Sequence, residues 1–214
     1  MSDPADDQTQ ELLQRALAGD ESALAALFDA YRDRLRRMIR LRLDRRLSGR
    51  VDSSDVLQEA YLDVRKRIDE YARDPAAMPF HLWLRLVAGQ RLTDLHRYHL
   101  GAQMRDVGME VSLHRGPFPQ ADSVSLAAQL LGKMTSASKA AIRAEHKLIV
   151  QEALNGMDPI DREVLALRHF EHLSNDETAQ VLGLSKSAAS NRYIRALKRL
   201  KEILSSIPAL RDQV

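Results

Sequence analysis

Residues 174–200 read SNDETAQVLGLSKSAASNRYIRALKRL, and this stretch decides the fold that we expect for the C-terminal part of the chain. Ser174 and Glu177 have the spacing of a capping box, which predicts that a helix begins here. Gly183 is typical of the residue that ends a helix, and Ser185 is typical of the cap that begins another. A short helix, a tight break and a longer helix together predict a helix-turn-helix.

The two helices of this motif differ in charge, which separates their roles. The first is acidic, whereas residues 186–201 carry six basic residues and no acidic one. Only the second helix therefore suits a groove lined by phosphates. Its candidate DNA-contacting residues are Ser187, Ser190, Asn191, Arg192, Arg195 and Arg199. An ordinary helical hairpin with a charged outer face would show the same pattern, and the sequence leaves that interpretation open.

The composition excludes several classes of protein. The chain has 214 residues, of which 44% are hydrophobic, with only 9 Gly and 7 Pro, so an all-β fold with many turns is not expected. The absence of cysteine excludes disulfides, thiolate metal sites and a cysteine nucleophile. No apolar run approaches the roughly 18 residues of a membrane span, and the acidic N-terminus does not resemble a signal peptide. We therefore expect a soluble, cytoplasmic, all-α protein.

Apolar periodicity divides the chain into two helical parts. Helical spacing of apolar residues covers residues 9–100 and resumes over residues 140–206. Residues 101–139 are richer in Gly, Pro and small polar residues and predict a linker, with a short helix conceivable at residues 124–131. The sequence therefore predicts two small helical domains joined by a long linker.

Charge is segregated along the chain. Residues 1–29 carry seven acids and one arginine, net −6, whereas residues 32–50 carry nine arginines and two aspartates, net +7. Blocks of opposite sign indicate separate surfaces for separate partners, although solvated helix faces produce similar blocks.

Three motifs in order give the chain a resemblance to a known family. MDPIDREVLALR at residues 157–168, followed by LSNDETAQVLGLS, resembles region 4 of bacterial sigma-70 family RNA polymerase sigma factors, in the small extracytoplasmic-function (ECF) group. DSSDVLQEAYLDV at residues 52–64 resembles region 2.2, and FHLWLRLVA at residues 80–88 resembles region 2.3. The segment between the two domains is similar to ECF sequences of planctomycete-type bacteria.

The resemblance implies a function without catalysis. It implies that the chain binds core RNA polymerase and directs promoter-specific initiation, with no cofactor. Residues 9–100 would bind polymerase and would recognise and melt the −10 element, and residues 140–206 would recognise the −35 element. An anti-sigma factor, a regulatory kinase or the linker itself would be candidate regulators.

The resemblance also assigns residues to partners. Asp55, Gln58 and Glu59 would contact core polymerase. Helix capping already explains Asp52, whereas Gln58 and Glu59 lie in the middle of the expected helix. The melted −10 strand would meet Arg85, Gln90, Arg91, His96 and Arg97.

Several apolar residues beside these positions are expected to be core rather than contact residues. They are Tyr61, Leu62, Val64 and Trp83.

The sequence departs from the family pattern at positions that read DNA. Ala188 stands where the family usually has Thr, and Ser190 stands where a basic residue is frequent. Gln90 stands where many relatives carry an Asn that captures a flipped base. The promoter sequence therefore cannot be transferred from a relative.

Other functions find less support in the sequence. There is no phosphate-binding Gly-rich loop and no zinc-protease or nucleophile-elbow motif. His96 with His99, and His169 with His172, lack an obvious third ligand, so no metal site is expected. A stand-alone helix-turn-helix regulator would leave the motifs at 52–64 and 80–88 without a role. A helical protein-interaction adaptor, in which both domains bind protein only, is the third interpretation.

Overall fold

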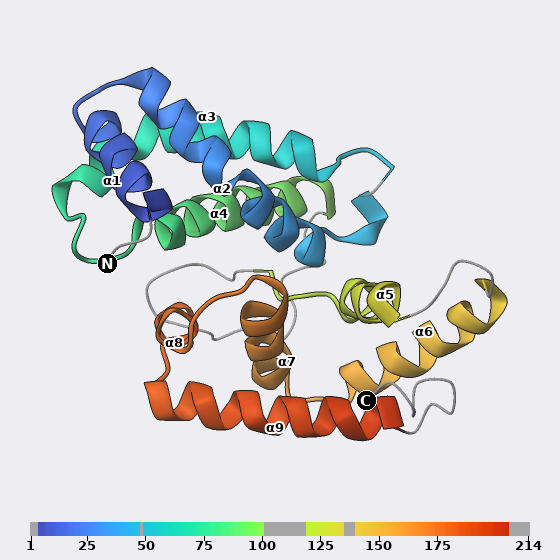
Figure 1. Ribbon diagram of the computed structural model, residues 1–214. Helices are drawn as coiled ribbons and strands as arrows, with labels where there is room; N and C mark the ends of the chain where they lie inside the picture. Colours follow the sequence, from blue (N-terminus) through green and yellow to red (C-terminus); the bar gives the residue numbers. More distant parts are fainter. Residues whose placement is uncertain (1–3, 48, 101–118, 135–139, 206–214) are drawn as a thin grey trace. The chain divides into compact units, whose positions relative to one another are not determined.

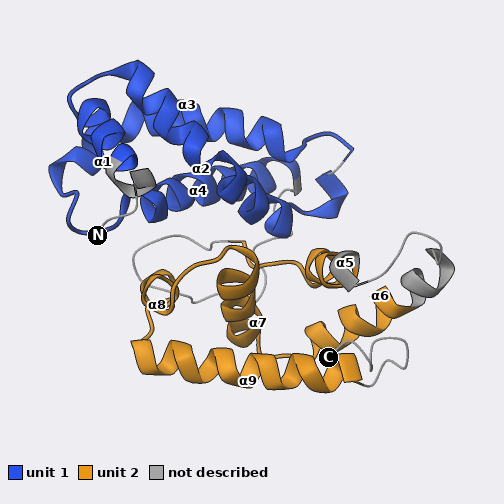
Figure 2. Ribbon diagram, viewed as in Figure 1, with its two compact units in different colours: residues 1–109, 116–118 blue, residues 110–115, 119–214 orange. Residues whose placement is uncertain are grey.

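The computed structural model describes residues 4–47, 49–100, 119–134 and 140–205, and every regular element among them is helical (Figure 1). The chain divides into two compact units, shown in different colours in Figure 2. Unit 1 comprises residues 1–109 and 116–118, and unit 2 comprises residues 110–115 and 119–214. The predicted all-α fold with two small helical domains is confirmed.

The described part of unit 1 is built from four long helices. They are α1 (Pro4–Leu17), α2 (Glu21–Arg42), α3 (Ser53–Arg73) and α4 (Phe80–Leu100), with a 3₁₀ turn at Arg45–Leu47. Helix α1 packs along α2, and α3 packs along α4, while α2 contacts both α3 and α4. This arrangement brings the two sequence motifs at 52–64 and 80–88 together on neighbouring helices.

The helices of unit 1 begin where the sequence supplies a capping side chain. Asp20 accepts hydrogen bonds from the backbone N–H groups of Ser22 and Ala23, at 2.9 and 3.0 Å. Asp52 accepts from Ser54 in the same way at 2.6 Å. These bonds satisfy N–H groups that have no partner within the helix.

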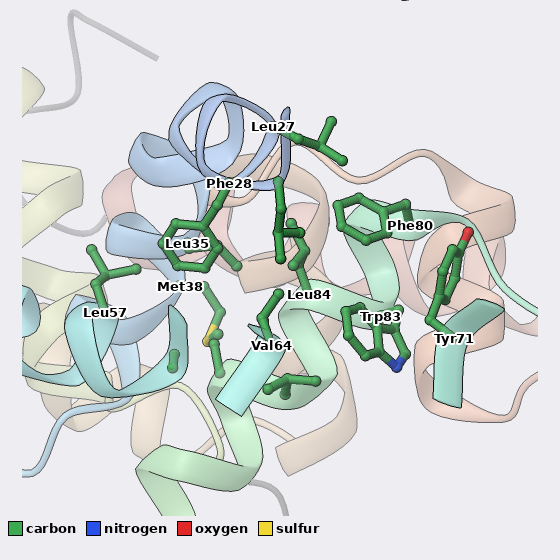
Figure 3. Close-up of a cluster of buried hydrophobic side chains, with 14 of the residues drawn as sticks. Leu27, Phe28, Leu35, Met38, Leu57, Val64, Tyr71, Phe80, Trp83 and Leu84 are labelled. Atoms are coloured by element: carbon green, nitrogen blue, oxygen red, sulfur yellow. The ribbon is translucent and has the colours of Figure 1, made fainter. Parts of the chain in front are cut away.

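The core of unit 1 contains most of its apolar side chains (Figure 3). Trp83 is 7% exposed, and its ring lies 5.2 Å from that of Tyr71 and 5.7 Å from that of Phe80. Trp83 and the fully buried Val64 are therefore core residues, as predicted. The same prediction is wrong for Leu62, which is 48% exposed.

Unit 2 contains five helices and one π-helical turn among its described residues. They are α5 (Ser123–Met134), α6 (Ala140–Asn155), α7 (Pro159–Leu165), the π-helical turn Ala166–Phe170, α8 (Asn175–Leu182) and α9 (Lys186–Ser205). Helices α7 and α8 both pack on α9, and α5 packs along α6.

The helix-turn-helix has the predicted local structure. Glu177 N–H donates to Ser174 Oγ at 3.2 Å, and Ser174 N–H donates to a Glu177 carboxylate oxygen at 2.6 Å, which completes the capping box. Gly183 ends α8 at φ 64°, a left-handed conformation that favours glycine. Ser185 Oγ accepts from Ala188 N–H at 3.2 Å at the start of α9.

Part of the predicted linker is structured and belongs to unit 2. Leu126 and Leu131 of α5 are 0% and 1% exposed. Ala121 N–H donates to Glu163 Oε2 at 2.9 Å, which ties the segment before α5 to α7. The rest of the predicted linker, residues 101–118 and 135–139, lies outside the described residues.

Candidate nucleic-acid interface

One side of α9 is exposed and carries a row of polar side chains beside the exposed Ile194. Ser187, Asn191 and Arg195 follow one another at intervals of four residues, and all three are exposed. Residues at this spacing share one side of a helix. The opposite side, which includes Ala189 and Ala196, is buried in unit 2.

The other candidate DNA-contacting residues of α9 differ in their exposure to solvent. Arg199 is exposed and forms an ion pair with Glu202 at 3.1 Å, one turn away on the same helix. Surface pairs of this kind contribute little free energy, so Arg199 can exchange Glu202 for a phosphate. Ser190 and Arg192 are only half-exposed and border the buried side.

Two of the predicted DNA-contacting arginines are held by one buried carboxylate. Arg195 donates from Nη2 to Asp161 Oδ1 at 2.7 Å and from Nε to Asp161 Oδ2. Arg192 Nη1 donates to Asp161 Oδ1 at 2.7 Å and lies 3.3 Å from Asp158 Oδ1. Asp161 is 4% exposed and lies in the first turn of α7.

The electrostatics of this cluster favour its charged form. Burial alone would raise the pKa of the Asp161 carboxyl, but the hydrogen bonds from Arg195 and Arg192 outweigh it and hold the pKa below its usual range. The same hydrogen bond raises the pKa of Arg195. The pairs therefore persist at neutral pH.

The acidic side of α3 is exposed, but its first member has a structural role. Asp55 Oδ2 accepts from Asp52 N–H at 2.9 Å and closes a capping box at the start of α3. Gln58 and Glu59 are exposed, in the middle of the helix. Leu62 lies four residues after Gln58 and adds an apolar side chain to this exposed side.

The predicted −10 residues Gln90 and Arg91 connect α4 to α3. Arg67 Nη1 donates to Gln90 Oε1 at 2.6 Å. Arg91 donates from Nε and Nη2 to the Asp63 carboxylate, at 2.7 and 2.8 Å, and lies 3.4 Å from Glu59 Oε2. One candidate polymerase contact, Glu59, thus touches one candidate DNA contact.

Comparisons with known proteins agree with this geometry. The family model described as "Sigma-70, region 4" matches residues 147–200, which include α7, α8 and most of α9. The ECF RNA polymerase sigma factor BldN of Streptomyces coelicolor is 27% identical over 91% of this chain. RNA polymerase sigma-H factor of Pseudomonas aeruginosa is 25% identical over 96% of this chain. The chain is therefore similar to sigma factors of the ECF group of the sigma-70 family.

The extent of these matches differs between relatives. The chain spans 65% of the length of BldN and 97% of that of the sigma-H factor. A solved structure of CnrH, in complex with the cytosolic domain of CnrY, has a TM-score of 0.56 and 22% identity and covers 93% of this chain and 98% of its own. This likeness shows that the two share a fold. The planctomycete-type group stays a prediction.

The remaining candidate DNA-contacting residues, on α4, differ in exposure. His96 is 3% exposed, and its Nε2 accepts from Asp44 N–H at 3.2 Å, so it stabilises unit 1 rather than offering a polar surface. Burial lowers the pKa of His96, which keeps the ring neutral and able to accept. Arg85 is largely buried as well, and its contact with DNA stays a prediction. Arg97 is exposed, 3.7 Å from Asp94.

Sequence reasoning missed Asp161 and Leu62. Asp161 is separated from Arg195 by more than thirty residues, and its acidic first-turn position is typical of any helix start. Leu62 did carry a signal, because its spacing from Gln58 places both on one side of α3.

The described residues were also compared with the requirements of a metal site and of a membrane span. No group of three His, Cys, Asp or Glu side chains among them could hold a metal ion. None of the helices seen in the structure is long and apolar enough to cross a membrane.

Proposed function

We propose that this chain is a sigma factor, which binds core RNA polymerase in the cytoplasm and directs it to a specific set of promoters, without catalysing a reaction itself. The observation that carries the proposal is the helix-turn-helix of unit 2, whose second helix exposes Ser187, Asn191 and Arg195 in line. A major groove admits one helix, and short polar and arginine side chains read base edges there. Unit 2 would therefore read the −35 element through α9.

Unit 1 would bind polymerase and the melted −10 strand through neighbouring helices. Gln58, Glu59 and Leu62 form a mixed acidic and apolar side of α3 that suits a basic partner helix with an apolar contact. Gln90, Arg91 and Arg97 of α4 are the candidates for the DNA strand. Asp55 is less suited to binding, because its carboxylate is engaged in the capping box.

We propose that a further protein partner regulates the chain, with an anti-sigma factor as the candidate. The support is that CnrH, which shares the fold, was solved in complex with the cytosolic domain of CnrY. Co-purification of the full chain from its host would identify such a partner.

Run-off transcription with the cognate core polymerase tests the main proposal. We expect defined start sites with the full chain and none with core polymerase alone. Sequence-specific DNA binding without any affinity for core polymerase would instead favour a stand-alone regulator. Binding to protein partners without DNA binding would favour an adaptor.

A further inference from the structure

We infer that Asp161 is a positioning residue for promoter recognition, which orients the guanidinium of Arg195 so that its outer edge meets a guanine in the upstream element. The inference rests on the proposed function, because it assigns a base to the exposed side of α9. It also gives a role to Asp161, a buried carboxylate that touches that side.

The pairing with Asp161 uses one edge of the guanidinium and leaves another open. Nε and one Nη2 hydrogen of Arg195 point to the two oxygens of Asp161. A guanidinium has five N–H donors, so both Nη1 hydrogens and the second Nη2 hydrogen stay available. These end-on donors are parallel, and their spacing matches O6 and N7 of guanine in the major groove.

The burial of the two partners shows which one is fixed. The side chain of Asp161 is 6% exposed, whereas that of Arg195 is 59% exposed. Asp161 is further held by Arg192, and its backbone N–H lies 3.3 Å from Asp158 Oδ1. Asp161 is therefore the rigid anchor, and it limits the rotamers of Arg195 before DNA arrives. Ordering a long side chain in advance lowers the entropic cost of binding.

The charge balance favours a base over a phosphate as the target of Arg195. Arg192 and Arg195 face two carboxylates, Asp158 and Asp161, so the cluster has no net charge. A carboxylate beside the arginine repels a phosphate, which carries a full negative charge. The acceptors of a guanine edge carry only partial charges and are repelled much less.

The test measures base preference with the complete holoenzyme. DNA with a randomised upstream element is selected by core polymerase carrying the wild-type chain, Asp161→Asn, Arg195→Ala or Arg195→Lys. Glu202→Gln is the matched control, because it removes the same charge beside another arginine of α9. Circular dichroism of each free chain checks that the variants fold.

The inference predicts a specific pattern of base preferences among the variants. We expect a guanine preference at one position, which Arg195→Ala and Arg195→Lys reduce by about tenfold or more, because a bidentate contact is lost. Asp161→Asn should reduce the preference by about three- to tenfold at that position alone, the cost of ordering one long side chain. Glu202→Gln should leave it unchanged.

Three outcomes would overturn the inference. They are an unchanged preference in Asp161→Asn, a loss spread over all positions, and tighter binding of Asp161→Asn to every sequence, which would show that Asp161 competes with DNA for Arg195. Should Asp161→Asn not fold, a guanine preference that survives in Arg195→Lys would refute the bidentate contact. Failure of the proposed function is distinguishable, because the wild-type holoenzyme would then select no sequence at all.

Discussion

Removal of α5 should destabilise unit 2, although α5 lies within the predicted linker. Leu126, Leu130 and Leu131 are 0%, 6% and 1% exposed, and α5 packs along α6. At about 1.5 kcal/mol for each buried leucine, the low end of the usual range, the three contribute about 4.5 kcal/mol to the free energy of unfolding. A small domain has only about 5–15 kcal/mol in total.

Two fragments make this measurable by urea unfolding. Residues 119–214 contain α5, and residues 140–214 lack it. We expect cooperative unfolding of the longer fragment and partial or complete unfolding of the shorter one in water. Within the longer fragment, Leu126→Ala should cost about 2–5 kcal/mol, because it leaves a cavity. Leu148→Ala is the control, since Leu148 is 60% exposed on α6 and should change stability by less than about 0.5 kcal/mol.

The reasoning would be refuted by equal unfolding midpoints and equal slopes for the two fragments. Equal losses of stability in Leu126→Ala and Leu148→Ala would also refute it. A positive result has a practical consequence, because DNA-binding experiments on an isolated C-terminal domain must then use a fragment that begins before α5.

Two further predictions concern unit 1. Because burial lowers the pKa of His96 below its usual 6.5, the unfolded state binds more protons, so stability should be lost as pH falls below about 6.5. His96→Gln, which keeps an acceptor for Asp44 N–H, should show a smaller fall in urea midpoint between pH 7 and pH 5. On α3, Leu62→Ser should weaken binding to core polymerase in a pull-down titration and change thermal stability little. Asp55→Ala should instead lower stability by about 1 kcal/mol, because it removes half of a capping box. An unchanged polymerase affinity in Leu62→Ser would show that this side of α3 is merely solvated.

Local sequence patterns predicted the helices well, because the interactions that end a helix lie within a few residues. The capping box of Ser174 and Glu177 and the left-handed Gly183 were both predictable for this reason. Pairs of residues that lie far apart in the sequence were not predictable. Nothing near Arg195 in the sequence indicates that Asp161 holds it, and nothing near Gln90 points to Arg67. The apolar residues 124–131 did suggest a short helix within the linker, but nothing near them indicated that α5 would pack along α6 as part of unit 2.

The polar site residues that the sequence assigned to DNA are largely occupied within the folded protein. Gln90 and Arg91 bond to α3, and Arg192 and Arg195 bond to α7. DNA binding therefore exchanges partners or uses donors left open, rather than adding new charge. The number of counterions released should fall short of the number of basic residues on α9, since a guanidinium paired with a carboxylate neutralises little phosphate charge.

We expect two kinds of residue on α9 to contribute differently to DNA binding. Lys198 and Lys201 are exposed, and we expect them to supply the salt-dependent attraction to phosphates. Their substitution should therefore reduce the dependence of affinity on salt concentration. Arg195, balanced by Asp161, should contribute little to that dependence and much to base preference. Titrations of the holoenzyme with DNA at several salt concentrations would separate the two roles. Lys198→Ala should reduce the slope of affinity against salt concentration. Arg195→Ala should leave this slope unchanged and remove the discrimination between DNA sequences. Equal slopes for both variants would contradict this division.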